Sequence, residues 1–288
     1  MRSTTGMQGL GAAVAAGLLF ASPLGFAKVY QPSADPQLRS TAVLVVDKSD
    51  ATVIYSKRAE VAAPIASITK LMTALVVLDG KQPLEQMLEI TRADSSLRKG
   101  AASRLAFGTR LTRGELLHLA LMSSENRAAH ALGRNYPGGI KAFVKAMNIK
   151  ARAFGMAHSR FVDPVGLSEE NVASPADLVK LVAAASQRAL INEYSTDRAH
   201  TVRVGRRLME YHNTNSLVSN PSWTINLQKT GYINEAGKCL VMQAVIEGRT
   251  VVMVLLDSYG KYTRVADAKR IRLWMEAKAR ASSRSAAL

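Results

Sequence analysis

The stretch Pro64-Ile-Ala-Ser67-Ile-Thr-Lys70-Leu-Met-Thr-Ala74 places a serine and a lysine three residues apart at the head of an apolar run. Residues at i and i+3 share one face of a helix, so the Ser67 hydroxyl and the Lys70 amine are expected to be neighbours. The run is apolar on nearly every face, which predicts a buried helix. Alone, this string also fits a capped core helix whose lysine extends to solvent.

A serine hydroxyl is a poor nucleophile until a base takes its proton. Lys70 could be that base if its pKa falls, because burial disfavours the charged amine and a second cation would do so further. Lys229 is the candidate for the second cation. A similar string, Ser96-Leu-Arg-Lys99, is a decoy, since short motifs of this kind also arise by chance.

Ser124-Glu125-Asn126 follows an apolar helix that ends near Met122. The Ser124 hydroxyl could relay a proton to a leaving amine, and the Asn126 amide could hold a substrate carbonyl or Lys70. The alternative is an ordinary polar helix end capped by Ser123 or Ser124. In either case we expect Glu125 to face solvent.

Lys229-Thr230-Gly231 ends a predicted strand. A strand edge can bind an extended peptide by strand addition, and Lys229 and Thr230 could hold its carboxylate. Gly231 is expected to let the substrate approach the backbone closely. The alternative is a simple turn at the end of the strand.

Strand-forming runs lie at both ends of the chain, and the middle carries helix signals such as the capping box Thr112-Arg-Gly-Glu115 and the start Ser174-Pro175. A basic helix is predicted from Tyr262 to Ala279. The first and last strands can join, so we predict an α/β (α+β) fold. Its five-stranded antiparallel sheet is covered by helices, with an all-helical subdomain inserted between the strands. The predicted strands cover residues 41–46, 52–55, 223–229, 240–246 and 251–256.

Arg2 precedes an uncharged stretch that ends Gly25-Phe26-Ala27, which predicts a cleaved signal peptide at residues 1–27. An uncleaved membrane anchor is the alternative. We expect one domain at residues 28–280 and a disordered tail at residues 281–288.

The formal net charge of the chain is +16. Because the protein is expected to be exported, nucleic acid is not the expected partner of this positive charge. The charge is better explained by attraction to an anionic cell envelope, and the alternative is that it serves only solubility. The five histidines show no metal-ligand spacing, and the single Cys239 lies in an apolar run typical of a core residue. We therefore expect no metal, no cofactor and no internal disulfide.

Together, the three strings resemble those of low-molecular-mass penicillin-binding proteins, serine peptidases of the D-alanyl-D-alanine carboxypeptidase and endopeptidase family. The resemblance covers about residues 41–275. Several flanking stretches resemble the D-alanyl-D-alanine endopeptidase branch, the penicillin-binding protein 7 type: Leu119–Ala129, Tyr136–Gly139, Phe161–Leu167, Asn213–Asn215 and Gly260–Thr263.

The resemblance implies a β-lactamase/transpeptidase-like fold and a role for each matched residue. The nucleophile would be Ser67 and the base Lys70, with Ser124 and Asn126 in the proton and substrate network. The substrate carboxylate would lie at Lys229, Thr230 and Gly231. The oxyanion hole would be formed by the backbone N–H groups of Ser67 and Tyr232.

The implied reaction is hydrolysis of D-alanyl cross-links in peptidoglycan, in the periplasm, with β-lactam antibiotics as covalent inhibitors. The protein would be soluble or loosely associated with membrane or cell wall. The chain departs from the family at Ile233, where a hydroxyl residue is common, and it ends without the C-terminal β domain and anchor of larger carboxypeptidases.

Three alternatives stay open. The first is a D-alanyl-D-alanine carboxypeptidase. The second is a serine β-lactamase, although the deacylating E-x-x-L-N pattern is replaced by Glu169-Glu-Asn171. The third is a non-catalytic envelope-binding protein.

Overall fold

The computed structural model describes residues 35–95 and 103–286. The expected signal peptide at residues 1–27 and the decoy serine Ser96 lie outside the described residues. Within the described part of the chain, no helix is both long enough and apolar enough to cross a membrane.

Strands from the two ends of the chain form one antiparallel sheet, as predicted. The strand order is β2-β1-β11-β10-β9, so β1 pairs with β11 across the largest sequence separation and β9 lies at an edge. The bounds are β1 Ser40–Asp47, β2 Val53–Lys57, β9 Thr224–Ile233, β10 Gly237–Ile246 and β11 Arg249–Ser258.

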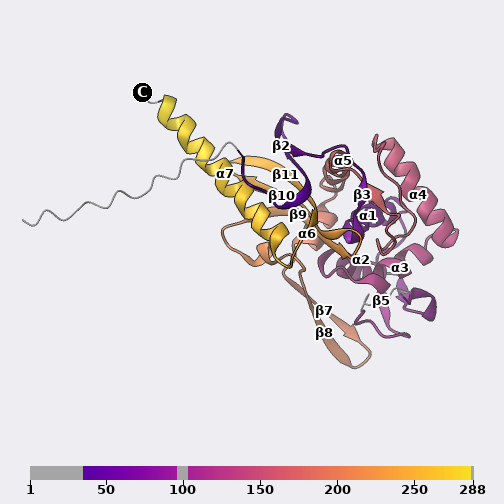
Figure 1. The fold of residues 1–288 in the computed structure, drawn as a ribbon. Helices are drawn as coiled ribbons and strands as arrows, with labels where there is room; N and C mark the ends of the chain where they lie inside the picture. Colours follow the sequence, from indigo (N-terminus) through magenta and orange to yellow (C-terminus); the bar gives the residue numbers. More distant parts are fainter. Residues whose placement is uncertain (1–34, 96–102, 287–288) are drawn as a thin grey trace, which may run out of the picture. The chain divides into compact units, whose positions relative to one another are not determined.

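The strands alternate their side chains between two hydrophobic clusters, as the two-residue period of a strand requires. On one face, Val43 and Val45 of β1 pack with Ile271 and Trp274 of α7 (Thr263–Ala286). On the other face, α5 (Pro175–Ala185) packs against the sheet and the larger cluster continues into the helical region. Figure 1 shows α7 lying along the strands.

The helical region is built around α1 (Lys70–Asp79), which is buried along most of its length, as its uniformly apolar sequence predicts. The predicted starts at Thr112 and Ser174 are confirmed, since both hydroxyls accept a backbone N–H in the first turn. The other helices are η1 Ala66–Thr69, η2 Arg92–Asp94, α2 Arg113–Met122, α3 Asn126–Arg134, α4 Gly139–Ala153, α6 Ala189–Thr196 and η3 Ser216–Ser219.

The region between the outer strands is not purely helical. Three two-stranded pairs interrupt it, and the sequence analysis predicts none of them. They are β3 Ala63–Pro64 with β6 Val172–Ala173, β4 Met87–Glu89 with β5 Arg110–Thr112, and β7 Ala199–Val204 with β8 Arg207–His212.

The last helix, α7, continues to Ala286, beyond the predicted end at Ala279. It therefore includes residues 281–286 of the segment expected to be disordered. No glycine or proline ends the helix there, and the Ser282 and Ser283 hydroxyls donate to carbonyl oxygens one turn earlier.

A buried carboxylate ties α7 to the start of β1. Asp267 accepts hydrogen bonds from the backbone N–H of Arg39 (3.0 Å), and from the N–H and hydroxyl of Ser40 (both 2.7 Å). It is fully buried, and Arg270 pairs with its second oxygen at 2.6 Å.

We expect Asp267→Ala to lower the free energy of unfolding by about 3 kcal/mol, because buried donors of β1 lose their acceptor. Arg270→Ala is the control, since its partly exposed side chain should contribute about 1 kcal/mol or less. Urea denaturation of the two variants checks this, and equal losses would contradict the role given to the carboxylate.

Candidate active site

The structure brings Ser67 and Lys70 together, as their spacing predicts. Ser67 lies in η1 and Lys70 begins α1. The Lys70 Nζ atom lies 2.8 Å from Ser67 Oγ, 2.9 Å from Asn126 Oδ1 and 2.8 Å from the Val165 carbonyl oxygen. Lys70 is fully buried, whereas Ser67 keeps 8% of its surface accessible.

A second buried lysine comes from the edge strand β9. Lys229 Nζ donates to Ser124 Oγ at 2.8 Å and to the Thr230 carbonyl oxygen at 2.9 Å. Each of the two predicted Ser-x-Asn side chains therefore contacts a different lysine, Asn126 with Lys70 and Ser124 with Lys229.

Burial is the main cause of the altered acidity of both lysines. It lowers the pKa of Lys70 to about 7, against the opposing charges of Asp163 and Glu125. Burial also holds the pKa of Lys229 well below its ordinary value, and the charges of Lys70 and Arg264 lower it further. A Lys70 pKa near 7 leaves a large fraction of neutral amine at neutral pH.

The loop at residues 161–168 supplies the third acceptor of Lys70. The Asp163 carboxylate accepts the backbone N–H groups of Val165 and Gly166 (both 2.6 Å) and Ser168 (3.0 Å). Gly166 has φ +83°, and a Cβ there would lie 2.0 Å from the Ala66 carbonyl oxygen. The loop therefore packs directly on the turn that carries Ser67.

The sequence analysis quotes this loop only for its family resemblance and assigns no role to Asp163 or Val165. One sequence signal could have predicted this turn. An aspartate often accepts backbone N–H groups two and three residues later, and here a glycine, Gly166, stands three residues after Asp163. The contact to Lys70 comes from a backbone carbonyl, which no side-chain pattern reports.

Gly231 lies against the turn that carries Ser67, while the approach of a substrate to its backbone stays a prediction. A Cβ at this position would lie 3.0 Å from each of the Ser67 backbone N, the Ile65 carbonyl oxygen and the Ala66 Cβ. The space is therefore filled by the nucleophile turn, so the missing side chain lets β9 pack against η1.

Further groups surround the end of β9. The Thr230 and Thr214 hydroxyls hydrogen-bond at 2.6 Å. Arg264, at the start of α7, donates to the Gly231 carbonyl oxygen at 3.3 Å; the sequence analysis does not single out this arginine. The Tyr232 side chain is exposed, while Ile233 is buried in the core.

The prediction that Glu125 faces solvent is wrong. Glu125 is 6% exposed and accepts a hydrogen bond from Ser103. Ser123 is the C-cap of α2, as the alternative of a capped helix end predicts, and its hydroxyl donates to the Leu119 carbonyl oxygen. Ser124 adopts φ +60°, and neither serine caps α3. The chain thus turns sharply between α2 and α3 and directs Glu125 inward.

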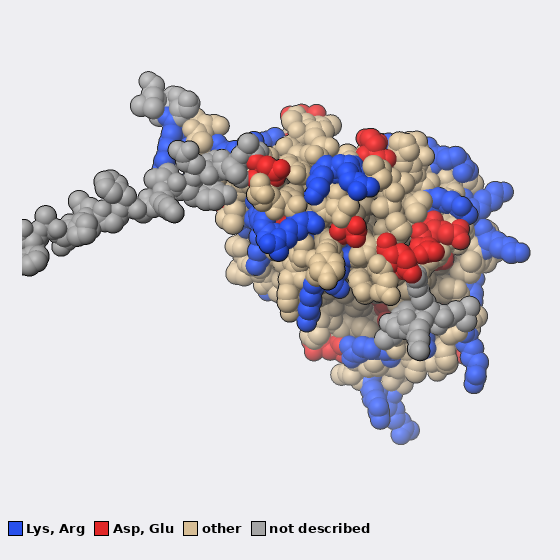
Figure 2. Space-filling view, viewed as in Figure 1, with Lys and Arg blue, Asp and Glu red and all other residues tan. Residues whose placement is uncertain are grey.

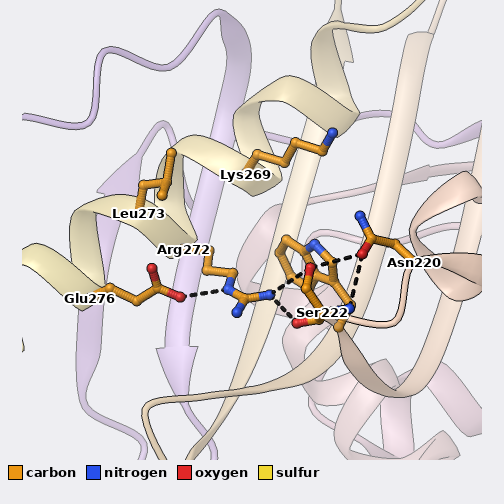
Figure 3. Close-up of a pocket in the computed structure, with 7 residues that line it drawn as sticks. Asn220, Ser222, Lys269, Arg272, Leu273 and Glu276 are labelled. Atoms are coloured by element: carbon orange, nitrogen blue, oxygen red, sulfur yellow. Dashed lines mark hydrogen bonds and ion pairs between the residues drawn. The ribbon is translucent and has the colours of Figure 1, made fainter.

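A cavity of about 280 Å³ lies elsewhere, between α7 and the segment at residues 220–223 (Figure 3). Its arginine, Arg272, already contacts Glu276, Ser222 and the Trp223 ring. None of the residues of the three strings lines this cavity. The predicted site residues that the structure brings into contact are the Ser67–Lys70 and Ser124–Lys229 pairs.

A serine hydroxyl in contact with a buried lysine is the arrangement found in serine enzymes that use a Ser–Lys pair in place of a histidine–carboxylate triad. Residues 28–260 match the peptidase S11 family, described as D-alanyl-D-alanine carboxypeptidase, and the chain belongs to this family.

Similar proteins agree with this assignment. The chain is 49% identical to a D-alanyl-D-alanine endopeptidase of Pseudomonas aeruginosa (83% of this chain, 78% of the relative) and 46% identical to one of Escherichia coli (85% and 79%). The crystal structure of the Streptomyces K15 DD-transpeptidase is similar with a TM-score of 0.78 at 28% identity, covering 84% of this chain and 98% of that one.

The lowered Lys70 pKa predicts how stability depends on pH. Above about pH 7 the folded state binds fewer protons at Lys70 than the unfolded state, whose lysine titrates near 10.5. Stability therefore rises with pH between these values, by about 1.4 kcal/mol per pH unit for this one group.

We expect the unfolding free energy of wild type to rise relative to Lys70→Met as the pH is raised from 7.5 to 9.5, measured by urea denaturation. Leu71→Ala, in the same buried helix but without a titratable group, should differ from wild type by a constant amount. A constant difference for Lys70→Met as well would contradict the lowered pKa.

Proposed function

We propose that this protein is a serine DD-peptidase that hydrolyses D-alanyl cross-links of peptidoglycan through an acyl-enzyme on Ser67. The observation that carries the proposal is the 2.8 Å contact between Ser67 Oγ and the buried Lys70 amine, whose pKa of about 7 suits a base at neutral pH.

In the acylation step, neutral Lys70 accepts the Ser67 proton and the serine oxygen attacks the D-alanyl carbonyl. Asn126 and the Val165 carbonyl oxygen hold the amine in place. The backbone N–H groups of Ser67 and Tyr232 are the proposed oxyanion hole, supported by the close packing of the intervening Gly231 on the Ser67 turn.

The proton must then reach the leaving amine. As the amide bond of the tetrahedral intermediate breaks, the leaving amine takes the proton from Lys70 through the Ser124 hydroxyl, which is held at 2.8 Å from Lys229 and is the proposed relay. Water then attacks the acyl carbonyl and gives a proton to Lys70, which returns it to the Ser67 oxygen as the ester bond breaks. Thr230, together with Lys229 and Arg264, supplies hydrogen-bonding and positive charge for a substrate carboxylate at the end of β9.

The endopeptidase activity is favoured over carboxypeptidase activity by the relatives. Proteins named D-alanyl-D-alanine endopeptidase are 49% and 46% identical to this chain, whereas a Streptomyces protein named D-alanyl-D-alanine carboxypeptidase is 29% identical. Ile233 is buried and has no hydroxyl to donate to a terminal carboxylate of the substrate. Its presence agrees with endopeptidase activity, which depends less on such a carboxylate.

The proposal places the enzyme in the periplasm, since residues 1–27 have the composition of a signal peptide. Loose attachment to the anionic envelope is supported by the net charge of +16. Figure 2 shows separate groups of Lys and Arg side chains on the face in view, with fewer Asp and Glu groups among them. High salt should weaken attachment that depends on exposed charge.

Gly231→Ala tests the packing that holds the nucleophile. The added methyl group meets the Ser67 backbone N at 3.0 Å, so the turn must shift and the proposed oxyanion hole must open. We expect acylation by a fluorescent penicillin to slow by at least about tenfold. Gly114→Ala is the control, because its nearest neighbours lie 3.5 Å or more away; equal rates for both variants would exclude the role of Gly231.

The substrate is tested with purified enzyme on separated muropeptides, analysed by chromatography and mass. We expect cross-linked dimers to become monomers faster than pentapeptides lose D-alanine, and Ser67→Ala to leave both unchanged. Dominant pentapeptide trimming would instead support the carboxypeptidase, and rapid turnover of penicillin would support a β-lactamase.

A further inference from the structure

Glu125 is the middle residue of the Ser-x-Asn string, and the proposed mechanism gives it no role. Its two neighbours contact the two catalytic lysines, Ser124 with Lys229 and Asn126 with Lys70. Any displacement of residue 125 therefore moves both contacts at once.

The Glu125 side chain fastens this turn to the segment at residues 103–107. Ser103 donates its hydroxyl hydrogen to the Glu125 carboxylate and accepts the Leu105 N–H at 3.2 Å. Arg127 donates to the Leu105 carbonyl oxygen and lies 4.1 Å from the Phe107 ring centroid. The Glu125 side chain, from the turn, and the Arg127 side chain, from the start of α3, therefore both bind the segment at residues 103–107.

The turn needs such support because Ser124 adopts φ +60°, a conformation that non-glycine residues rarely adopt. Its backbone bonds run to the flanking helices: the Ser123 and Glu125 N–H groups donate to the Leu119 carbonyl oxygen (3.2 and 3.1 Å), and the Ala129 N–H donates to the Glu125 carbonyl oxygen (3.3 Å). The Ser103–Glu125 bond adds a contact from a separate segment of the chain.

Several charged or titratable groups face this carboxylate and Lys70. Burial raises the pKa of Glu125, opposed by Ser103, Lys70 and Arg127. Tyr211 of β8 is also near, and burial together with the Glu125 charge raises its pKa to about 12. Lys70 is faced by the Asp163 carboxylate from the loop at residues 161–168, and its charge acts on Lys229 of β9.

We propose that Glu125 is a positioning residue for acylation, which holds the Ser124–Asn126 turn through Ser103 and acts on the base Lys70 through its negative charge. The inference rests on the proposed acyl-enzyme but not on which D-alanyl substrate is cleaved.

The charge has a predictable sign. A carboxylate near Lys70 favours the protonated amine, so its removal lowers the Lys70 pKa. Acylation needs the neutral amine and therefore rises with pH through that pKa. In Glu125→Gln, which keeps the shape and a hydrogen-bond acceptor, this rise should occur at lower pH.

The test is the pH profile of acylation by a fluorescent penicillin, from pH 5 to 9, for wild type and Glu125→Gln. We expect the midpoint of the rise to move to lower pH. The rate at pH 5.5 relative to pH 8 should increase about threefold for each half unit that the midpoint moves. An unchanged midpoint would overturn the action of the charge on Lys70.

Two further variants separate the effect of the Ser103–Glu125 hydrogen bond from the effect of the Glu125 charge. Ser103→Ala removes the hydrogen bond but keeps the carboxylate, so the maximal rate should fall by about threefold or more with a smaller change in the midpoint. Glu125→Asp keeps the charge on a shorter side chain, so its midpoint should stay at the wild-type value while its maximal rate falls; a midpoint lowered as in Glu125→Gln would overturn the action of the charge. An unchanged maximal rate in Ser103→Ala would overturn the positioning role.

Glu170→Gln is the matched control, because its carboxylate is 60% exposed and solvent screens its charge. It should reproduce the wild-type profile, and a shift equal to that of Glu125→Gln would make the effect non-specific. If wild type is acylated but leaves muropeptides intact, the proposed substrate fails while this inference stands. If wild type is not acylated, both fail.

Discussion

The burial of Lys70 is the constraint on which the rest of the structure depends. An amine taken out of water must find partners for its hydrogen atoms or lose its charge. Its three acceptors come from three segments: Ser67 from its own turn, Asn126 from the start of α3, and the Val165 carbonyl oxygen from the loop at residues 161–168. The helical region therefore closes around one nitrogen atom.

The sheet supplies the other side of the site. Its edge strand β9 carries Lys229 and Gly231, so the same strand buries a second cation and packs against the Ser67 turn. An edge strand leaves backbone groups unpaired, which is a risk for aggregation but also a means to bind an extended peptide. Arg264 of α7 already lies at this edge. The N- and C-terminal strands that make the sheet, together with α7, thus place the β9 edge beside the Ser67 turn.

Local patterns in the sequence predict the elements and the Ser67–Lys70 pair, because both depend on neighbours within one helix or strand. The contacts of Lys70 to Asn126 and Val165 span 56 and 95 residues, and the second goes to a backbone atom. Glu125 is predicted on the wrong side because the turn at Ser124 has a left-handed residue that the sequence does not signal. The β7–β8 hairpin is different: alternating residues flank Gly205-Arg206, a pattern typical of a two-residue turn that a helical reading of the region overlooks.

The burial of two lysines works against stability. Two fully buried lysines, both with lowered pKa values, cost folding free energy near neutral pH, since the unfolded chain keeps them charged in water. That cost is offset by the apolar helix α1 beneath Lys70 and by the clusters on both faces of the sheet. The long apolar run after Lys70 therefore has two effects: it supplies the low-dielectric surroundings that lower the pKa of the amine, and the hydrophobic burial that keeps the amine there.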